Sequence, residues 1–390
     1  MTDMGVLRQM VAAENRCVDL APQSRKTVKM SNEPFPQLKY CVRCCLPETV
    51  EGITFDERGL CNGCNSSEQK MRINWEERER TLREKLEYYK SIAGDGYHCI
   101  VPISGGKDSC YQLYMMTRVY GMRVLAVTFS HSWFGETGRW NLENALEKFD
   151  IDHIMFTPKR SLVNRLAKRS LYTIGDSCWH CHAGVGAFSL QVAIRFGIKL
   201  LVWGESAAEN GTKADYAKPI LFDEQYFQRI SAKASIEEMA VDDITPEELW
   251  MFRFPTSKDM QAAGIEGIHL GNYVFWDDER CVEFLKREIG WREDNVEGTY
   301  KGYKSVECRM AGMHDYLKYL KRGFGRATDH ATRDVRAGIL TREEGFELVK
   351  RYDSKRPDCM DYYLGITGLE EEEVERTIKA LRKGRACELD

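Results

Sequence analysis

The stretch HCIVPISGGKDS, residues 98–109, decides the fold of this chain. Its first six residues are mostly apolar and predict a short buried strand. The next six, SGGKDS at 104–109, contain two glycines that permit a tight turn, and a helical pattern follows over 108–120. A strand, a glycine-rich loop and a helix in this order direct unpaired backbone N–H groups and the positive end of the helix dipole at the loop. The stretch therefore predicts an anion-binding loop at the carboxyl end of a strand.

Strands and helices alternate on both sides of this loop, as in doubly wound parallel sheets. We therefore expect an α/β protein with a Rossmann-type sheet and, beyond residue 277, a helical, charged region packed on that sheet. Further strands are expected at 123–129, 153–157, 199–203 and within 265–276, and helices at 75–92, 139–149, 160–173, 183–196, 278–288, 314–322, 342–352 and 370–383.

The side chains of the loop suit a phosphate ligand. Lys107 brings a positive charge, and Ser104 and Ser109 bring hydroxyl donors on either side of the two glycines. Asp108 is placed either to cap the helix or to help hold Mg²⁺. The loop lacks the four-residue spacer between glycines that a Walker A motif requires. The alternative to a phosphate site is a glycine turn that only begins a helix.

Two Cys-x-x-Cys pairs precede the expected α/β region. The pairs Cys41/Cys44 and Cys61/Cys64 have the spacing of a zinc ribbon. Four thiolates complete a tetrahedral shell, so the predicted zinc site is structural rather than catalytic. The surrounding segment has too few apolar residues to form a hydrophobic core of its own, so it needs a bound metal ion to stabilise it. Cys45 is an alternative ligand to Cys44.

A third pair lies inside the α/β region, in the sequence CWHCH before an expected helix. Cys178, Cys181 and His182 could bind a metal or a cluster, carry redox chemistry, or line a substrate pocket. A metal cluster would need a distant further ligand such as Cys281 or Cys308. His182 is equally consistent with a core histidine satisfied by hydrogen bonds.

Glu205 follows the strand expected at 199–203. Ligands bind outside the carboxyl ends of strands in open α/β sheets, so this carboxylate should face the same crevice as the glycine loop. It is either a helix-capping residue or a ligand to magnesium or substrate.

Composition narrows the classes of function. The chain has 390 residues, 43% of them hydrophobic, and a net charge of −4 without a long block of one sign. Because proteins that neutralise many phosphates are usually basic, no nucleic-acid partner is expected. No stretch reaches the ~20 apolar residues of a membrane span, and the first residues lack the apolar core of a secretory signal. We expect a cytoplasmic protein whose 14 cysteines serve as metal ligands and free thiols.

The loop at 104–109 resembles the SGGxDS signature of the PP-loop ATP pyrophosphatases, which have the adenine nucleotide alpha-hydrolase-like fold. In that class the loop holds the β- and γ-phosphates of ATP and leaves the α-phosphate open to attack. The end of the second strand contacts adenine through its backbone. The implied ATP-binding residues are Ser104, Gly105, Gly106, Lys107, Asp108, Ser109, Thr128 and Ser130.

A longer set of motifs resembles the N-acetyl sugar amidotransferase family of bacterial surface-polysaccharide and flagellar-glycan pathways. The resemblance covers about residues 40 to 365, and Cys45 and the leader before Lys39 depart from it. The stretches that carry it are CVRCCLPETVEGITFDERGLCNGC (41–64), YHCIVPISGGKDSCYQ (97–112), GDSCWHCHAGVGAF (175–188), LVWGES (201–206) and MAGMHDYLKYLKRGFGRATDHATRDVRAGILTREEGFELVKRYD (310–353).

The resemblance implies that ATP adenylates the amide oxygen of a sugar's acetamido group and that ammonia then displaces AMP, which leaves an acetamidino group. Lys107, Asp108 and Glu205 would be catalytic, and ATP, Mg²⁺ and Zn²⁺ would be the cofactors. The acceptor would be a nucleotide-linked or nonulosonic acetamido sugar. Ammonia would come from a separate glutaminase subunit, with a cyclase-like barrel subunit as a further companion.

These inferences divide the chain into four expected segments. They are a flexible extension over 1–36, a zinc-ribbon module over 37–74, a PP-loop ATP-binding catalytic domain over 75–276 and a helical region over 277–390. Two other functions fit some of the motifs. A PP-loop tRNA thiolase can combine zinc knuckles with an iron–sulfur cluster on a Cys-x-x-Cys pair, and a non-catalytic nucleotide-binding module could retain the fold. The acidic charge balance argues against the first, and the intact loop argues against the second.

Overall fold

The computed structural model describes residues 33–210, 215–217, 232–241 and 243–389, and within them five strands form one parallel sheet. The strand order β3-β2-β1-β4-β5 confirms the predicted doubly wound α/β fold. The winding direction reverses between β1 and β4, and ligands bind outside the carboxyl ends of the strands at such a point. The strands are β1 (Cys99–Pro102), β2 (Val124–Phe129), β3 (His153–Phe156), β4 (Leu200–Trp203) and β5 (Glu266–His269).

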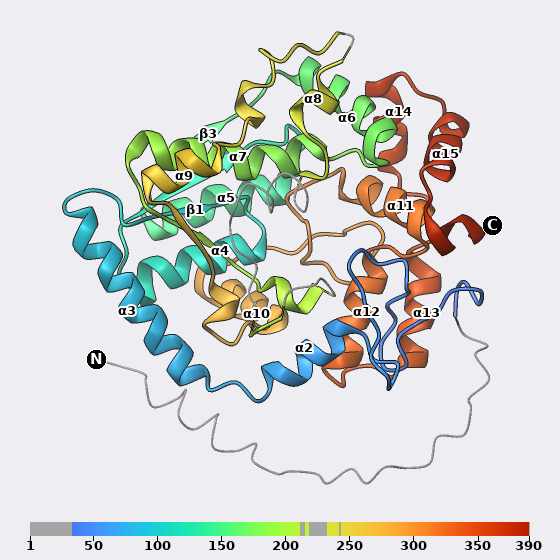
Figure 1. Cartoon of the computed structure of the whole chain (residues 1–390), viewed down its shortest axis with the longest axis horizontal. Coiled ribbons are helices and arrows are strands. Elements are labelled where there is room, and N and C mark those ends of the chain that lie inside the picture. The colour runs from blue at the N-terminus through green and yellow to red at the C-terminus, as the bar shows by residue number, and fades with distance from the viewer. Residues whose placement is uncertain (1–32, 211–214, 218–231, 242, 390) are drawn as a thin grey trace. The chain divides into compact units, whose positions relative to one another are not determined.

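Helices cover both faces of this sheet (Figure 1). Most of the extension expected over 1–36 lies outside the described residues, and Pro34–Asp390 forms one compact unit. The described helices are α2 (Asn62–Lys70), α3 (Trp75–Ala93), α4 (Lys107–Tyr114), α5 (Glu136–Phe149), α6 (Arg160–Ile174), α7 (Trp179–Phe196), α8 (Ile236–Met239), α9 (Ser257–Ala263), α10 (Asp278–Ile289), α11 (Ala311–Arg322), α12 (Arg326–Arg336), α13 (Arg342–Tyr352), α14 (Cys359–Thr367) and α15 (Glu371–Ala380).

Alternation along the strands builds two separate cores. Val101 and Val202 pack in one core with α4, α5 and α10, whereas Ile100 and Leu201 pack in the other with α6 and α7. Successive side chains of a strand point to opposite faces, so neighbours in sequence enter different cores. All four side chains are buried. Such continuous apolar runs are typical of parallel strands that are covered on both faces.

Two sequence-based expectations about helices need correction. The helix expected over 108–120 stops at Tyr114, and a π-helical turn, Met115–Val119, continues it. Helix α12 was not predicted because its buried face is built from Ala327, His330 and Ala331 rather than from large apolar residues. The helix is amphipathic, but its buried face consists of small and polar residues, so it lacks the stripe of large apolar side chains on which the other helices were predicted.

The helices beyond residue 277 do not all pack on the sheet, contrary to expectation. Only α10 joins the layer formed by α4 and α5. Helices α11, α14 and α15 pack beside α6 around Leu317, Tyr363 and Ile378. Helices α12 and α13 pack together, and Phe346 of α13 shares an apolar cluster with Tyr40 of the cysteine-rich segment. The C-terminal helices therefore connect the cysteine-rich segment to the α/β core.

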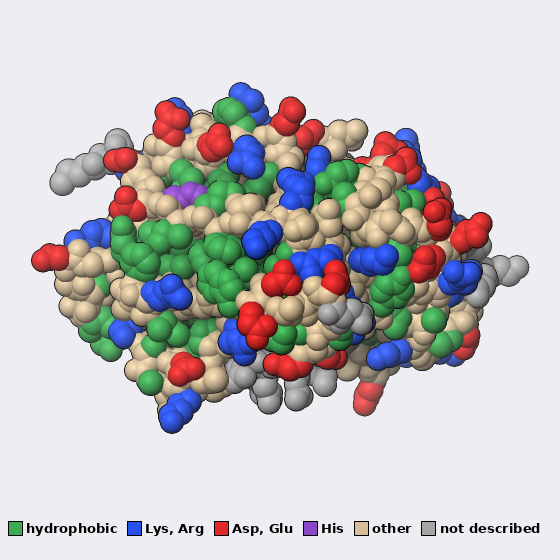
Figure 2. Space-filling model, turned by 90° about the horizontal axis from the view of Figure 1, so that it is seen from above, with side chains coloured by type: hydrophobic (Ala, Val, Ile, Leu, Met, Phe, Trp, Pro, Cys, Tyr) green, Lys and Arg blue, Asp and Glu red, His purple; other side chains and the backbone are tan. Residues whose placement is uncertain are grey.

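None of the described helices is both long enough and apolar enough to span a membrane. On the face drawn in Figure 2, basic and acidic side chains are interspersed. On this face the basic and acidic side chains are therefore not separated into large blocks of one sign.

Candidate active site and cysteine cluster

The glycine loop follows β1 at the carboxyl edge of the sheet. Gly105 has a φ of +87°, a region of backbone space that favours glycine. A Cβ at this position would lie 2.3 Å from the carbonyl oxygen of Gly138 in α5. Trp291 donates its indole N–H to the Gly105 carbonyl oxygen at 3.0 Å, and the hydroxyls of Ser104 and Ser109 lie 3.5 Å apart. Neighbouring elements thus hold the loop in one defined conformation.

Asp108 does not cap the helix that the loop begins. The N-cap of α4 is Gly106, which supplies no side-chain cap. The Asp108 carboxylate instead accepts a hydrogen bond from the Trp276 indole at 3.2 Å and contacts the ammonium group of Lys107. The capping interpretation is therefore wrong, and the first N–H groups of α4 remain directed at the loop.

Three carboxylates converge beside the loop. Asp108 comes from α4, Glu205 follows β4, and Asp278 begins α10. One oxygen of each lies within 4.8 Å of the others, so together they could hold a metal ion. The three elements meet because β1 and β4 are neighbours in the sheet and α10 packs on α4. Carboxylates this close repel one another unless cations lie between them.

Three basic side chains supply that compensation. Lys107 Nζ lies 2.7 Å from a carboxylate oxygen of Asp278. Lys304 Nζ lies 3.4 to 3.5 Å from an oxygen of each of the three carboxylates. Arg333 of α12 places one guanidinium nitrogen 3.2 Å from Glu205 and another 2.5 Å from Asp278. The result is a network of alternating charges, which we call the carboxylate cluster.

The network fixes the ionisation of its members. Burial alone would raise the pKa of Glu205, but Lys304 and Arg333 outweigh it and lower that pKa to about 2. The pKa of Asp278 is also well below its ordinary value, because the same two cations and Lys107 overcome burial. Burial likewise opposes the charge on Lys107, yet the neighbouring carboxylates raise its pKa. Glu205, Asp278 and Lys107 are therefore all charged at neutral pH.

Two clefts, of about 250 and 490 Å³, lie beside the carboxylate cluster. They share Glu205, His330, Arg333 and Arg336 as lining residues, so α12 forms a wall of both. Segment 67–72, at the end of α2, lines the larger cleft. The glycine loop lines neither cleft. A ligand in these clefts therefore meets the carboxylate cluster before it meets the loop.

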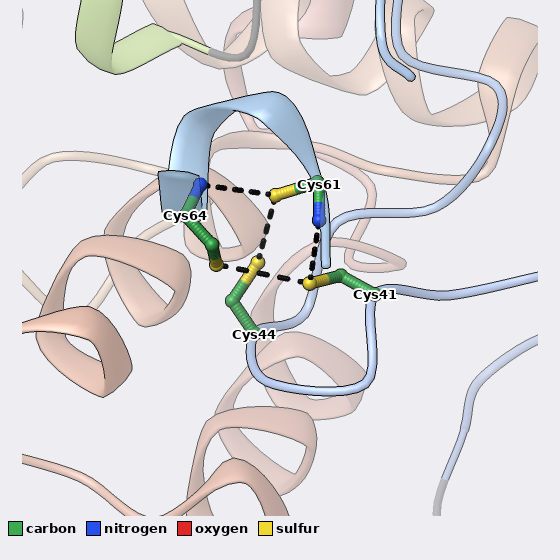
Figure 3. Close-up of side chains that lie close together, drawn as sticks. All are labelled: Cys41, Cys44, Cys61 and Cys64. Carbon is green, nitrogen blue, oxygen red and sulfur yellow. Dashed lines mark hydrogen bonds between the residues drawn. The ribbon is translucent and has the colours of Figure 1, made fainter. Parts of the chain in front are cut away.

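The sulfur atoms of Cys41, Cys44, Cys61 and Cys64 face one another, as Figure 3 shows. The Cys41–Cys64 and Cys44–Cys61 sulfur atoms are each 3.7 Å apart. Four sulfurs about 2.3 Å from a tetrahedral zinc ion would lie about 3.8 Å from one another, so the spacing fits that geometry. All four side chains are fully buried. We call this group the cysteine cluster; it has the closed character of a structural site.

Cys44 rather than Cys45 belongs to the cysteine cluster, so the alternative ligand was wrong. The Cys45 sulfur lies 3.9 Å from a carbonyl oxygen at the start of α13, within an apolar contact. Arg336 of α12 brings a guanidinium nitrogen to 3.5 Å from the Cys61 sulfur and 3.8 Å from the Cys44 sulfur. Since Arg333 lies one turn earlier on α12, this helix joins the cysteine cluster to the carboxylate cluster.

The CWHCH motif forms the first turn of α7 instead of preceding the helix. Cys178 is the N-cap residue. Cys178 and Cys181 lie in an apolar cluster that also contains Cys308, whereas Cys281 belongs to a different core. Burial raises the pKa of Cys181, so its thiol stays protonated. The motif's thiols are not among the groups of described residues that could together hold a metal.

His182 is exposed, so its interpretation as a core histidine was wrong. Its ring centroid lies 5.5 Å from that of His314 in α11. His314 Nδ1 lies 2.8 Å from a carboxylate oxygen of Asp176. The structure thus brings His182 together with residues that sequence reasoning did not connect to it.

Thr128 and Ser130, at the carboxyl end of β2, are buried. The Thr128 hydroxyl donates to the carbonyl oxygen of Ile103 at 2.6 Å and lies 2.8 Å from a ring nitrogen of His153. The Ser130 N–H donates to the carbonyl oxygen of Phe156 at 2.8 Å. Neither residue lines the two clefts. Contact between this strand and adenine stays a prediction.

Sequence reasoning missed several charged residues at the loop. Asp278 was taken only as the start of a helix, and Lys304 and Arg333 carry no local motif. Glu307 was also missed. Its Oε2 lies 2.9 Å from where a Cβ of Gly106 would be, and this oxygen has no hydrogen-bond partner among the described residues. Burial raises the pKa of this carboxyl group. None of these positions has a signal in a single sequence, because only tertiary packing brings them to the loop.

The fold and these residues define an α/β protein with a carboxylate cluster at the switch point of a doubly wound sheet and a closed cysteine cluster connected to it by α12. Residues 297–386 match the family described as the C-terminal domain of WbpG-like LPS biosynthesis proteins. The chain is also 21% identical over 299 residues to an uncharacterised protein of Methanocaldococcus jannaschii, covering 76% of this chain and 87% of that protein. The C-terminal region, which contributes Lys304 and Arg333, is therefore similar to that of proteins of LPS biosynthesis.

Proposed function

We propose that the chain is an AMP-forming, ATP-dependent ligase that converts an acetamido group of a sugar into an acetamidino group. The observation that carries the proposal is the glycine loop at the start of α4, with Lys107 and three carboxylates gathered beside it at the switch point of the sheet. The similarity of residues 297–386 to LPS biosynthesis proteins supports a role in surface-polysaccharide or flagellar-glycan synthesis. The family resemblance of the sequence motifs supports the particular reaction.

In the first half-reaction, the amide oxygen of the acetamido group would attack the α-phosphorus of ATP and release pyrophosphate. The N–H groups at the start of α4 and the ammonium group of Lys107 would stabilise charge on the phosphates. An amide oxygen is a poor leaving group, whereas the same oxygen leaves readily as part of AMP. In the second half-reaction, ammonia would add to the imidate carbon and lose a proton as the C–O bond to AMP breaks.

The carboxylate cluster fits a magnesium ion. Mg²⁺ prefers oxygen ligands and is commonly bound by one or two carboxylates together with phosphate oxygens. Asp108, Glu205 and Asp278 offer such oxygens beside the loop. They would hold the ion, which supplies neutralising charge for the phosphates. Lys304 and Arg333 now contact the same carboxylates, and they would turn toward the phosphates when the ion takes their place.

We propose that Zn²⁺ is the metal of the cysteine cluster, where its role would be structural. Cys41, Cys44, Cys61 and Cys64 fill a tetrahedral shell, which leaves no open position for a substrate. The metal would fasten the segment that precedes α3 against α12 and so support one wall of both clefts.

The proposed partners follow from the chemistry. The acceptor would be an acetamido sugar, nucleotide-linked or nonulosonic, and the reaction would take place in the cytoplasm, where ATP is available. Ammonia would come from a separate glutaminase subunit, with a cyclase-like barrel subunit as a further companion. Neither a nucleic acid nor a membrane is part of the proposal.

The test is to incubate the purified chain with ATP, Mg²⁺, ammonium and a panel of acetamido sugars. We expect AMP and pyrophosphate to form only when a sugar is present, and mass spectrometry to find a product in which one oxygen is replaced by NH. Glutamine should replace ammonium only when a glutaminase is added. ADP as the product would contradict the proposed role of the loop. AMP formation that requires tRNA would point instead to a tRNA thiolase.

A further inference from the structure

A second group of metal-binding side chains lies apart from both clusters described above. Asp176 precedes α7, His182 lies in its first turn, and His314 lies in α11. One ligand atom of each lies within 4.8 Å of the others. Asp176 and His314 are 138 positions apart in the sequence, so only the packing of α11 beside α6 and α7 brings them together.

The carboxylate of this group is already fixed in place. Asp176 is only 6% exposed, and its Oδ1 accepts the backbone N–H of Cys178 at 3.0 Å and the ring N–H of His314 at 2.8 Å. A carboxylate has about four lone-pair positions, so these two hydrogen bonds leave capacity for a further bond.

We propose that Asp176, His182 and His314 together bind one divalent transition-metal ion. Ligand atoms about 2.0 to 2.2 Å from such an ion lie about 3 to 3.5 Å apart, so small side-chain rotations would close the observed spacing. The His314 ring would bind through Nδ1 and carry its proton on Nε2, and the hydrogen bond to Asp176 would give way to two bonds to the ion. This proposal goes beyond the proposed function, which does not use these residues.

The ligand set and its surroundings select the kind of ion. Two imidazoles and one carboxylate suit Zn²⁺, Fe²⁺, Co²⁺ or Ni²⁺, whereas Ca²⁺ and Mg²⁺ require more oxygen ligands. Lys321, whose ammonium group donates to the carbonyl oxygens of residues 174 and 175, interacts electrostatically with Asp176, so the ion would bind against a neighbouring positive charge. Three protein ligands leave positions open for water or a substrate atom, as in catalytic metal sites.

Cobalt titration of the full-length, zinc-loaded chain tests the proposal. Co²⁺ at thiolates gives strong sulfur-to-metal absorption, which a site of nitrogen and oxygen ligands lacks. With Mg²⁺ in excess to occupy the carboxylate cluster, we expect one Co²⁺ per chain to bind with weak visible bands and no sulfur-to-metal band. His182→Ala and His314→Ala should each weaken this binding by roughly 100-fold or more, since losing even an outer partner of a ligand costs about 10- to 100-fold. His98→Gln, at the amino end of the central strand β1, should leave it unchanged.

The experiment measures cobalt binding and does not depend on enzymatic activity. Thermal unfolding of each variant will check that the replacement leaves the fold intact. Asp176→Asn, which keeps a hydrogen-bond acceptor but removes the charge, should also weaken cobalt binding. A wild-type chain that takes up no cobalt beyond the cysteine cluster, or a His182→Ala variant that binds it equally well, would overturn the proposal. AMP formation that persists in that variant would leave the proposed function standing.

Discussion

The cysteine cluster and the carboxylate cluster are both groups of potential metal ligands, but they are built in opposite ways. The cysteines come from one segment, with their most distant members 23 positions apart, and all four are fully buried. The carboxylates come from Asp108, Glu205 and Asp278 on three separate elements, and their cluster borders two clefts. The first is closed by its own ligands, and the second needs three basic side chains to offset its charge.

This difference is the basis for proposing a structural role for the cysteine cluster and a chemical role for the carboxylate cluster. A metal ion enclosed by four thiolates would have no open position for a substrate. The free energy of binding that metal would therefore add to the stability of the fold. In the carboxylate cluster, lysine and arginine could leave the carboxylates and contact phosphate while a cation takes their place. The ion-pair interactions of this cluster could then contribute to ligand binding. Four predictions follow from this contrast, taken from the largest expected effect to the smallest.

The double variant Cys41→Ser, Cys61→Ser should lose its zinc and unfold the segment around it. Apparent zinc-binding free energies in small thiolate sites are about 10 to 16 kcal/mol, and that energy contributes to folding. Metal analysis and thermal unfolding measure the two effects. Cys387→Ser, at an exposed position, is the matched control and should retain both metal and stability. A double variant that keeps its zinc would show that the cysteine cluster is not the metal site.

Lys107→Gln should reduce AMP formation by roughly 10²- to 10³-fold, because one well-placed electrostatic donor contributes about 2.7 to 4 kcal/mol to transition-state stabilisation. The side chain is fully buried between Asp108 and Asp278, so the variant should also be less stable. Replacing a polar residue at the start of a helix usually costs little stability. Because Lys107 is buried, we expect its replacement to lower the free energy of unfolding. Rates must therefore be measured per folded molecule.

Lys350→Gln, an exposed lysine on α13, controls for the loss of positive charge. It should change neither the rate of AMP formation nor the unfolding temperature. If Lys107→Gln retains wild-type rates once unfolded protein is accounted for, then the carboxylate cluster is a structural ion network rather than a part of the active site.

Arg336→Gln should weaken zinc binding by about 10- to 100-fold without abolishing it, the usual effect of removing a partner of metal ligands. Its guanidinium group lies 3.5 Å from the Cys61 sulfur and offsets the charge of the thiolates. Competition with a chromogenic chelator gives the affinity. Arg351→Gln, an exposed arginine on α13, should behave as wild type. Equal affinities for the two variants would mean that α12 does not stabilise the cysteine cluster.

Acid should destabilise the carboxylate cluster in a defined pH window. The pKa of Glu205 is about 2 in the folded chain, below its ordinary 4.5, so the unfolded chain binds more protons as the pH falls. The stability that Glu205 contributes is therefore complete above about pH 4.5 and is lost progressively toward pH 2. Glu205→Gln should show a shallower fall of unfolding free energy in this window by urea denaturation. Identical slopes would contradict the ion network.

Much of the fold was readable from local patterns. The strand and glycine loop at 98–109 were predicted because apolar runs and turn residues act through nearby backbone geometry. Prediction failed at α12, whose buried face is made of small and polar residues that pack only because α13 and the cysteine-rich segment are present. The prediction also placed the start of α7 too late, at residue 183. The helix begins at Trp179, within the CWHCH motif and before the apolar pattern starts.

By itself, the sequence determined the cysteine cluster and the existence of a loop beside a parallel sheet. In both cases the decisive residues are close together in the chain, and short-range geometry leaves few arrangements. Only the tertiary structure decided that Asp278, Lys304 and Arg333 complete the carboxylate cluster and that His314 meets His182. Contacts between such distant positions depend on how whole helices pack, and packing is fixed by the buried surface of many residues at once rather than by any one motif.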